Sequence, residues 1–206
     1  MNKVIALRDD QVTDGGNNAI EYSIPYIVAV EIQGIAPILF HRWNCEAVEE
    51  KAKAAKGSKA KKTDDIESFL YRDENGQICL PGEYVRQAVI VASKFKQDPR
   101  SPRKSAMDLF KAAIVSLTPL ASLGVTNPDF IDKRRVTVQR NGITRMRPAM
   151  KEGWKASVEL LVNLPEYVPP LLLKQVLDDA GRLVGVGDFR PTFGRFTVSN
   201  WTVKTE

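Results

Sequence analysis

Four glycines fall within the sixteen residues 181–196, GRLVGVGDFRPTFGRF, and this glycine-rich stretch constrains the fold more than any other. Glycine is favoured where the backbone needs a positive φ, or where a Cβ would block the close approach of another segment. We therefore expect a bent loop that packs tightly against another part of the protein, with Gly185, Gly187 and Gly194 at its bends.

The elements around this loop exclude the common nucleotide-cofactor sites. Those sites run strand, glycine loop, helix, whereas 181–196 follows a helical pattern and precedes a strand-like one, and the sequence contains no GKS or GKT. Two interpretations remain. The loop could hold a phosphate with its backbone N–H groups and with Arg190 and Arg195. Alternatively, Gly181 caps a helix and the arginines of the turn pair with nearby acids.

Composition limits the class of protein. A chain of 206 residues fits one domain and can bury a sizeable core. No apolar run approaches the ~20 residues needed to span a bilayer, so we expect a cytoplasmic protein that binds no membrane. Two cysteines and one histidine are too few for the usual four-ligand zinc site. We accordingly expect no metal and no cofactor.

The hydrophobic periodicity predicts an α+β chain in the order strand, helix, strand, strand, helix, strand. The predicted strands are 26–33, 114–120, 154–164 and 196–203, and the predicted helices are 82–96 and 169–183. This is the ferredoxin-like βαββαβ order, which also underlies RNA-recognition sheets. We expect a mobile arm at 1–23, in which Val4 to Leu7 could form a short edge strand, and a single domain at 24–206, with insertions at about 44–76 and 121–153.

Two segments concentrate positive charge in a chain whose formal net charge is +5. Residues 51–62 hold six lysines and no acid, which is typical of a solvated or disordered insertion or of a lysine arm for phosphates. Residues 134–150 predict a β-hairpin, because Asn141-Gly142 suits a two-residue type I′ turn. That turn would place Arg140, Arg145 and Arg147 on one side of an exposed ribbon.

Three stretches resemble the RAMP superfamily of CRISPR-associated RNA-binding proteins: IQGIAPILFHRW, LPGEYVRQAV and VGVGDFRPTFGRF. The residues that match its helix-opening motif are Leu80, Pro81, Gly82, Arg86 and Ala88, and those that match its glycine-rich loop are Gly185, Gly187, Arg190, Gly194 and Phe196. Glu83, Tyr84 and Gln87 stand where the helix-opening motif has small residues. The chain is also similar to small proteins that bacteriophages encode beside replication genes.

The resemblance implies a ferredoxin-like domain that coats a guide RNA as a filament beside other effector subunits. Backbone subunits of that superfamily press the RNA with a hairpin thumb, which here would be 134–148. In its processing members a catalytic histidine often follows the first strand, the position that His41 occupies in this chain.

We therefore expect a non-catalytic subunit that binds single-stranded RNA, with DNA as the alternative. The expected nucleic-acid contacts are Arg42, Lys59, Lys61, Lys62, Arg134, Arg135, Arg140, Arg145, Arg147, Arg190 and Arg195, with stacking from Trp43, Phe193 or Met146. One alternative is a metal-independent endoribonuclease with His41 as general base. The others are a phage single-strand-binding or recombination protein and a subunit that only docks other proteins.

Overall fold

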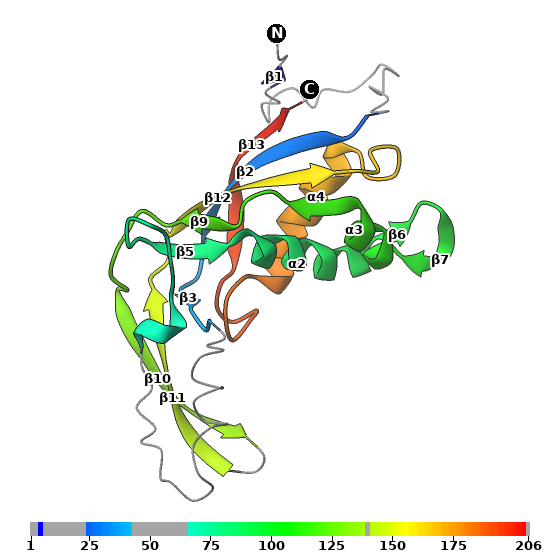
Figure 1. Cartoon of the computed structure of the whole chain (residues 1–206). Helices are drawn as coiled ribbons and strands as arrows, with labels where there is room; N and C mark the ends of the chain where they lie inside the picture. Colours follow the sequence, from blue (N-terminus) through cyan, green and yellow to red (C-terminus); the bar gives the residue numbers. More distant parts are fainter. Residues whose placement is uncertain (1–3, 6–23, 43–65, 139–140, 205–206) are drawn as a thin grey trace, which may run out of the picture.

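The structure is a computed structural model and describes residues 4–5, 24–42, 66–138 and 141–204. Within these residues an antiparallel five-stranded sheet forms the centre of the molecule (Figure 1). Its strands lie in the order β1 (Val4–Ile5), β13 (Phe196–Lys204), β2 (Tyr26–Gly34), β12 (Lys155–Val162) and β8 (Ile114–Ser116). The expected mixed α+β class is confirmed, and the arrangement is compatible with a ferredoxin-like core.

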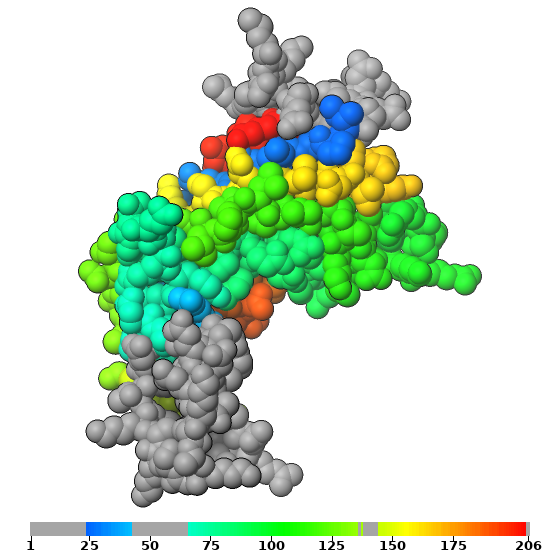
Figure 2. Space-filling model, in the orientation of Figure 1, coloured from blue at the N-terminus to red at the C-terminus, as the bar shows by residue number. Residues whose placement is uncertain are grey.

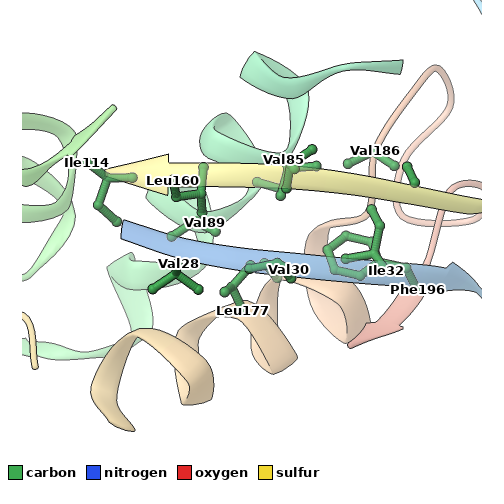
Figure 3. Close-up of a cluster of buried hydrophobic side chains, with 14 of the residues drawn as sticks. Val28, Val30, Ile32, Val85, Val89, Ile114, Leu160, Leu177, Val186 and Phe196 are labelled. Carbon is green, nitrogen blue, oxygen red and sulfur yellow. The ribbon is translucent and has the colours of Figure 1, made fainter. Parts of the chain in front are cut away.

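One face of this sheet carries the hydrophobic core. Along β2 every second residue is buried, as expected for a strand with one face against the core. The helices α2 (Gly82–Ala92) and α4 (Pro170–Asp179) supply the other side of the core. Figure 3 shows side chains from both layers in contact: Val28, Val30, Ile32, Val85, Val89, Leu160, Leu177 and Phe196.

The opposite face of the sheet carries ion pairs among its side chains. Glu31 of β2 pairs with Lys155 of β12, and Lys204 of β13 pairs with Glu159. The aromatic side chains that these described strands contribute, Tyr26, Phe196 and Trp201, are all buried in the core. The described part of this face therefore lacks the exposed rings with which an RNA-recognition sheet stacks bases.

The helices lie close to their predicted positions. The segment 82–96 forms α2 followed by the 3₁₀ turn η3 (Ser93–Phe95), and α3 (Met107–Ala113) leads into β8. The segment 169–183 forms α4 and continues as the π-helical turn η4 (Ala180–Val184). No helix in the described part of the chain is long and apolar enough to cross a bilayer.

A hairpin extends away from the central body (Figure 1). It consists of β10 (Phe130–Val138) and β11 (Asn141–Met150), and β11 also pairs with the short strand β3 (Ile38–Leu39). Nearby, β4 (Tyr71–Arg72), β5 (Ile78–Pro81) and β9 (Leu120–Ser122) form a separate small sheet. A second short hairpin, β6 (Gln97–Asp98) with β7 (Ser101–Ser105), forms a protrusion in Figure 2.

The hairpin is confirmed, but its predicted register is wrong. The structure pairs Val138 with Asn141 and Arg134 with Arg145, so Asn141 and Gly142 belong to β11 instead of forming the turn. At the base of the hairpin β11 also pairs with β3, Ala149 with Leu39 and Met150 with Ile38, and Arg147 of β11 forms an ion pair with Asp188. Contacts at the base of the hairpin therefore outweigh the local Asn-Gly preference.

Candidate nucleic-acid interface

The glycine-rich loop between η4 and β13 packs against β3, as its glycines predicted. The N–H of Asp188 donates to the carbonyl of Leu39 over 2.9 Å, and the N–H of Gly194 donates to Pro37 over 2.8 Å. A Cβ on Gly194 would lie 1.7 Å from the carbonyl oxygen of Val186, and one on Gly187 would lie 2.6 Å from that of Leu39. Both residues also have a positive φ, so only glycine fits at these two positions.

Two expectations for this loop need correction. Gly181 does not cap a helix; it lies inside η4, where its α-carbon faces the carbonyl of Phe196. Several loop amides also have partners within the protein: besides the two bonds to the β3 segment, Val186 donates to Gly194, and Phe193 donates to Phe189. These four N–H groups are therefore not available to a ligand.

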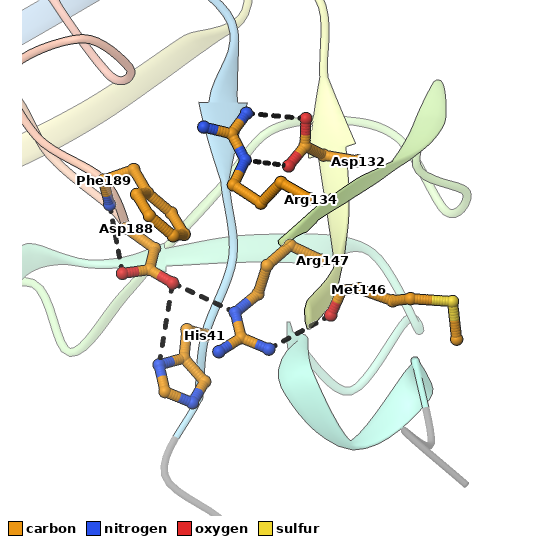
Figure 4. A network of polar contacts seen from close by, with 7 residues as sticks. All are labelled: His41, Asp132, Arg134, Met146, Arg147, Asp188 and Phe189. Carbon is orange, nitrogen blue, oxygen red and sulfur yellow. Dashed lines mark hydrogen bonds and ion pairs between the residues drawn. The ribbon is translucent and has the colours of Figure 1, made fainter. Parts of the chain in front are cut away.

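Arg147 ties the hairpin to the loop. Its Nε donates to Oδ2 of Asp188 over 3.0 Å (Figure 4). Its guanidinium lies 4.6 Å from the centre of the Phe69 ring. The side chain is only 3% exposed. We expected an exposed side chain here, but Arg147 is buried and forms an ion pair with Asp188, so it is not available to a ligand.

Arg134 forms a second set of contacts between the hairpin and the glycine-rich loop. It donates two hydrogen bonds to the carboxylate of Asp132. Its guanidinium lies 4.7 Å from the ring centre of Phe189 and 4.6 Å from that of Phe193, both in the glycine-rich loop. Cation–π contacts of this kind stabilise by about 0.5–2 kcal/mol each. Arg134 and Arg147 together fix the loop against the base of the hairpin.

Other cations of the hairpin remain available. Arg145 is half-buried beside His41, and Lys133 and Arg135 are exposed on the opposite face of the ribbon. Within the described residues, none of these three forms an ion pair with a carboxylate. The predicted contacts Arg140, Lys59, Lys61 and Lys62 and the predicted stacking residue Trp43 lie outside the described residues.

A pocket of about 290 Å³ opens next to these ties. We call it the histidine pocket; its lining residues are His41, Tyr84, Gln87, Gly187, Asp188 and Arg190. Three segments distant in sequence therefore build this pocket: the end of the β3 segment, the first turns of α2 and the glycine-rich loop.

Further cations surround the histidine pocket. Arg190 lines it, and Arg42 lies 5.6 Å from the ring centre of Tyr71, whose hydroxyl is 3.4 Å from that of Tyr84. Both arginines are exposed, and neither has a carboxylate partner in the described part of the chain. Arg195 is exposed too, but it does not line the pocket.

The sequence contained signals for pocket residues that we did not assign to the site. Asp188 is the one acid in the glycine-rich stretch, set between Gly187 and Phe189. An isolated acid in a basic loop often has a buried cationic partner. Tyr84 and Gln87 are two of the positions where the chain departs from the RAMP helix-opening motif, and both line the pocket.

Burial and the nearby arginines disfavour the protonated form of His41. Its Nδ1 lies 3.8 Å from Oδ2 of Asp188, and its ring packs edge-on against Phe69. Burial lowers the pKa of His41, and Arg147 and Arg145 lower it further, against an opposing contribution from Asp188. At neutral pH the imidazole is therefore uncharged and able to accept a proton.

We predict that the pKa of His41 lies below 6.5 and that Arg145→Gln raises it, because the substitution removes a nearby cation. His41 is the only histidine in the sequence, so an NMR pH titration reads its imidazole without ambiguity. Arg135→Gln, on the other face of the hairpin, is the control and should leave the pKa unchanged. A wild-type pKa above 6.5 would contradict the described environment.

The same shift makes unfolding pH-dependent. The folded pKa of His41 lies below the unfolded value, so the unfolded state binds more protons in the interval between them. The contribution of His41 to the free energy of unfolding is therefore fully present above pH 6.5 and falls as the pH drops through that interval.

No group of three or more potential metal ligands occurs among the residues that the structure describes. Cys79 is buried and unpaired, and Cys45 lies outside the described ranges.

No protein-family model and no curated protein matches this chain. Its fold is similar to that of a chain in a cryo-EM structure of the Type III-B Cmr-beta bound to cognate target RNA, with a TM-score of 0.52 and 10% sequence identity. The similarity covers 87% of this chain and 61% of that chain, so the protein spans about three fifths of the relative's length. At this identity the comparison shows a shared fold alone.

Proposed function

We propose that this protein is a non-catalytic subunit that binds single-stranded RNA where the hairpin meets the glycine-rich loop. One observation carries the proposal: Arg42, Arg145 and Arg190 lie around the histidine pocket without a carboxylate partner among the described residues. Asp188, the carboxylate that lines the pocket, is already paired with Arg147. The surplus of positive charge suits phosphate groups, which arginine binds with bidentate hydrogen bonds.

The fold supports a RAMP-like assignment. We assign the strands β2, β8, β12 and β13 and the helices α2 and α4 to a ferredoxin-like βαββαβ core within a single domain at 24–206. We assign 1–23 to an arm, of which Val4 and Ile5 pair with β13 at the edge of the sheet. The similar chain belongs to a complex described as bound to cognate target RNA. By extension we propose RNA, further effector subunits and copies of this chain in a filament as its partners, with the hairpin as the thumb.

Salt dependence tests this proposal. Five described cations are candidates for phosphate contacts: Arg42, Lys133, Arg135, Arg145 and Arg190. Each contact to a single strand contributes about 0.7 to the log–log slope, so the affinity should fall about 100-fold between about 0.05 M and 0.2 M salt. The measurement is fluorescence anisotropy with a labelled RNA strand, a DNA strand of the same sequence and an RNA duplex.

Each result of that titration bears on the proposal. Binding of single-stranded RNA that is tighter than that of the duplex supports it, and the comparison with DNA reports contacts to the 2′-hydroxyl. No binding of any strand even at about 0.05 M salt would contradict the proposal and leave a protein-docking subunit as the better explanation.

A metal-independent endoribonuclease is the second candidate, because the pKa values of two groups that line the histidine pocket shift in opposite directions. Burial and nearby arginines lower the pKa of His41, whereas burial and the contact with Tyr71 raise that of Tyr84. His41 could take the proton of a 2′-hydroxyl, the resulting oxygen would attack the phosphorus, and Tyr84 could protonate the leaving 5′-oxygen. Arg190 could stabilise the charged phosphorane.

Incubation of the same labelled RNA with the protein separates the two candidates. We expect intact RNA. Cleavage that disappears in His41→Ala, and that fails on a strand whose 2′-hydroxyls are replaced by hydrogen, would instead establish the endoribonuclease.

A further inference from the structure

We infer that a groove adjoining the histidine pocket holds an unpaired nucleobase, with the ring of Phe95 as its stacking surface. This inference rests on the proposed function and adds a subsite for bases to the surface that binds phosphates. We call this feature the phenylalanine groove.

The groove continues the histidine pocket on the other side of the glycine-rich loop. Its volume is about 440 Å³, and it shares Gly187, Asp188 and Arg190 with the histidine pocket. Its far wall consists of Val91, Lys94 and Phe95 from α2 and η3 and of Leu183 from η4. A strand whose phosphate contacts Arg190 could therefore place its next base in this groove.

The groove exposes apolar surface. Phe95 is 59% exposed, Leu183 is 41% exposed and Val91 is 36% exposed. Grouped apolar side chains left in water commonly mark a surface that binds a ligand or partner. Among the described phenylalanine, tyrosine and tryptophan side chains, the other exposed one is Tyr167, which lines neither pocket.

The charges of the residues that line the groove favour a nucleic acid as its partner. The ammonium of Lys94 lies 4.8 Å from the centre of the Phe95 ring, and Arg190 also lines the groove. The carboxylate at the groove, Asp188, is neutralised by Arg147. Apolar side chains together with two cations match a flat aromatic base and its flanking phosphates.

The central sheet leaves few other places for a base. Its outer face carries the Glu31–Lys155 and Glu159–Lys204 ion pairs, and the aromatic side chains of its described strands are buried. Phe189 and Phe193 already contact Arg134. Of the two phenylalanines that line the groove, Phe95 and Phe189, only Phe95 is exposed.

The test separates contacts to bases from contacts to phosphates. The probes are a fluorescein-labelled oligouridylate of about 12 nucleotides and an abasic strand of equal length, which keeps the phosphates and lacks the bases. We expect Phe95→Ala to weaken oligouridylate binding about tenfold, the size of one lost base–aromatic stack. The same substitution should leave binding of the abasic strand unchanged.

Two further variants complete the test. Phe95→Trp should retain oligouridylate binding, with indole fluorescence quenched by the stacked base. Tyr167→Ala removes the exposed aromatic outside the groove and should have no effect on either probe. Because Phe95 and Tyr167 are both exposed, neither truncation removes core packing.

Three results would overturn the inference while leaving the proposed function in place: unchanged oligouridylate binding by Phe95→Ala, equal losses on both probes, or equal wild-type affinity for both. If the wild-type protein bound neither probe at low salt, the proposed function and this inference would both be overturned.

Discussion

Replacing Arg145 and Arg190 together by glutamate is expected to weaken the binding of single-stranded RNA by at least about 25-fold at about 0.1 M salt. Each lost phosphate contact removes about 0.7 from the log–log slope, which at this salt corresponds to about fivefold in affinity. The introduced carboxylates also repel the strand. A salt titration should therefore show both a weaker affinity and a slope that is shallower by about 1.4.

The matched control changes the same net charge elsewhere. Arg103 and Lys104 are exposed on β7, in the short hairpin away from the histidine pocket. Arg103→Glu combined with Lys104→Glu also lowers the charge by four, so it tests whether net charge alone drives binding. Similar losses in both double variants would contradict a localised interface. Circular dichroism on each variant verifies that the fold is retained.

Local patterns predicted most of the elements of this fold, because their physical causes lie within a few residues. The alternation in 26–33 marks a strand with one buried face, and β2 has that pattern of burial. The proline at the start of the predicted helix 169–183 also agrees with α4, which begins at Pro170. Strand pairing in the hairpin was not predictable in this way, because contacts with other segments set its register.

The roles of the individual arginines depend on partners far away in the sequence. Arg147 and Arg145 are two residues apart on the same strand, and their local sequence offers no reason to distinguish them. The structure pairs Arg147 with Asp188, 41 positions away, and leaves Arg145 half-buried beside His41. A count of positive charges therefore located the basic segment but could not separate the arginines that hold the protein together from those available to a ligand.

In the glycine-rich loop, too, the local sequence predicted one property but not another. Its glycine content predicted a close approach to another backbone, which is a local requirement, and Gly187 and Gly194 meet it against β3 and Val186. Whether its amides are available to a phosphate depends on the segment that it packs against. The carbonyls of Pro37 and Leu39 accept two of these N–H groups, which the sequence could not reveal.

Gly194→Ala is expected to lower the free energy of unfolding by at least about 3 kcal/mol, because two unfavourable effects combine. At φ +71° any residue with a Cβ is strained, at a cost of about 1–2 kcal/mol. The new methyl would also lie 1.7 Å from the carbonyl oxygen of Val186, so the loop must move. Its hydrogen bond to Pro37 and the adjacent Asp188–Arg147 pair would be disturbed. Urea denaturation followed by tryptophan fluorescence measures the loss.

Gly76→Ala separates the two effects. Gly76 has nearly the same backbone angle, φ +74°, but no atom lies within 4 Å of the position that a Cβ would take there. This variant should therefore lose only the ~1–2 kcal/mol of backbone strain. Equal losses in the two variants would show that the contact with Val186 does not constrain the loop. If the loop positions Arg190, Gly194→Ala should also weaken RNA binding under conditions where the variant remains folded, whereas Gly76→Ala should bind normally.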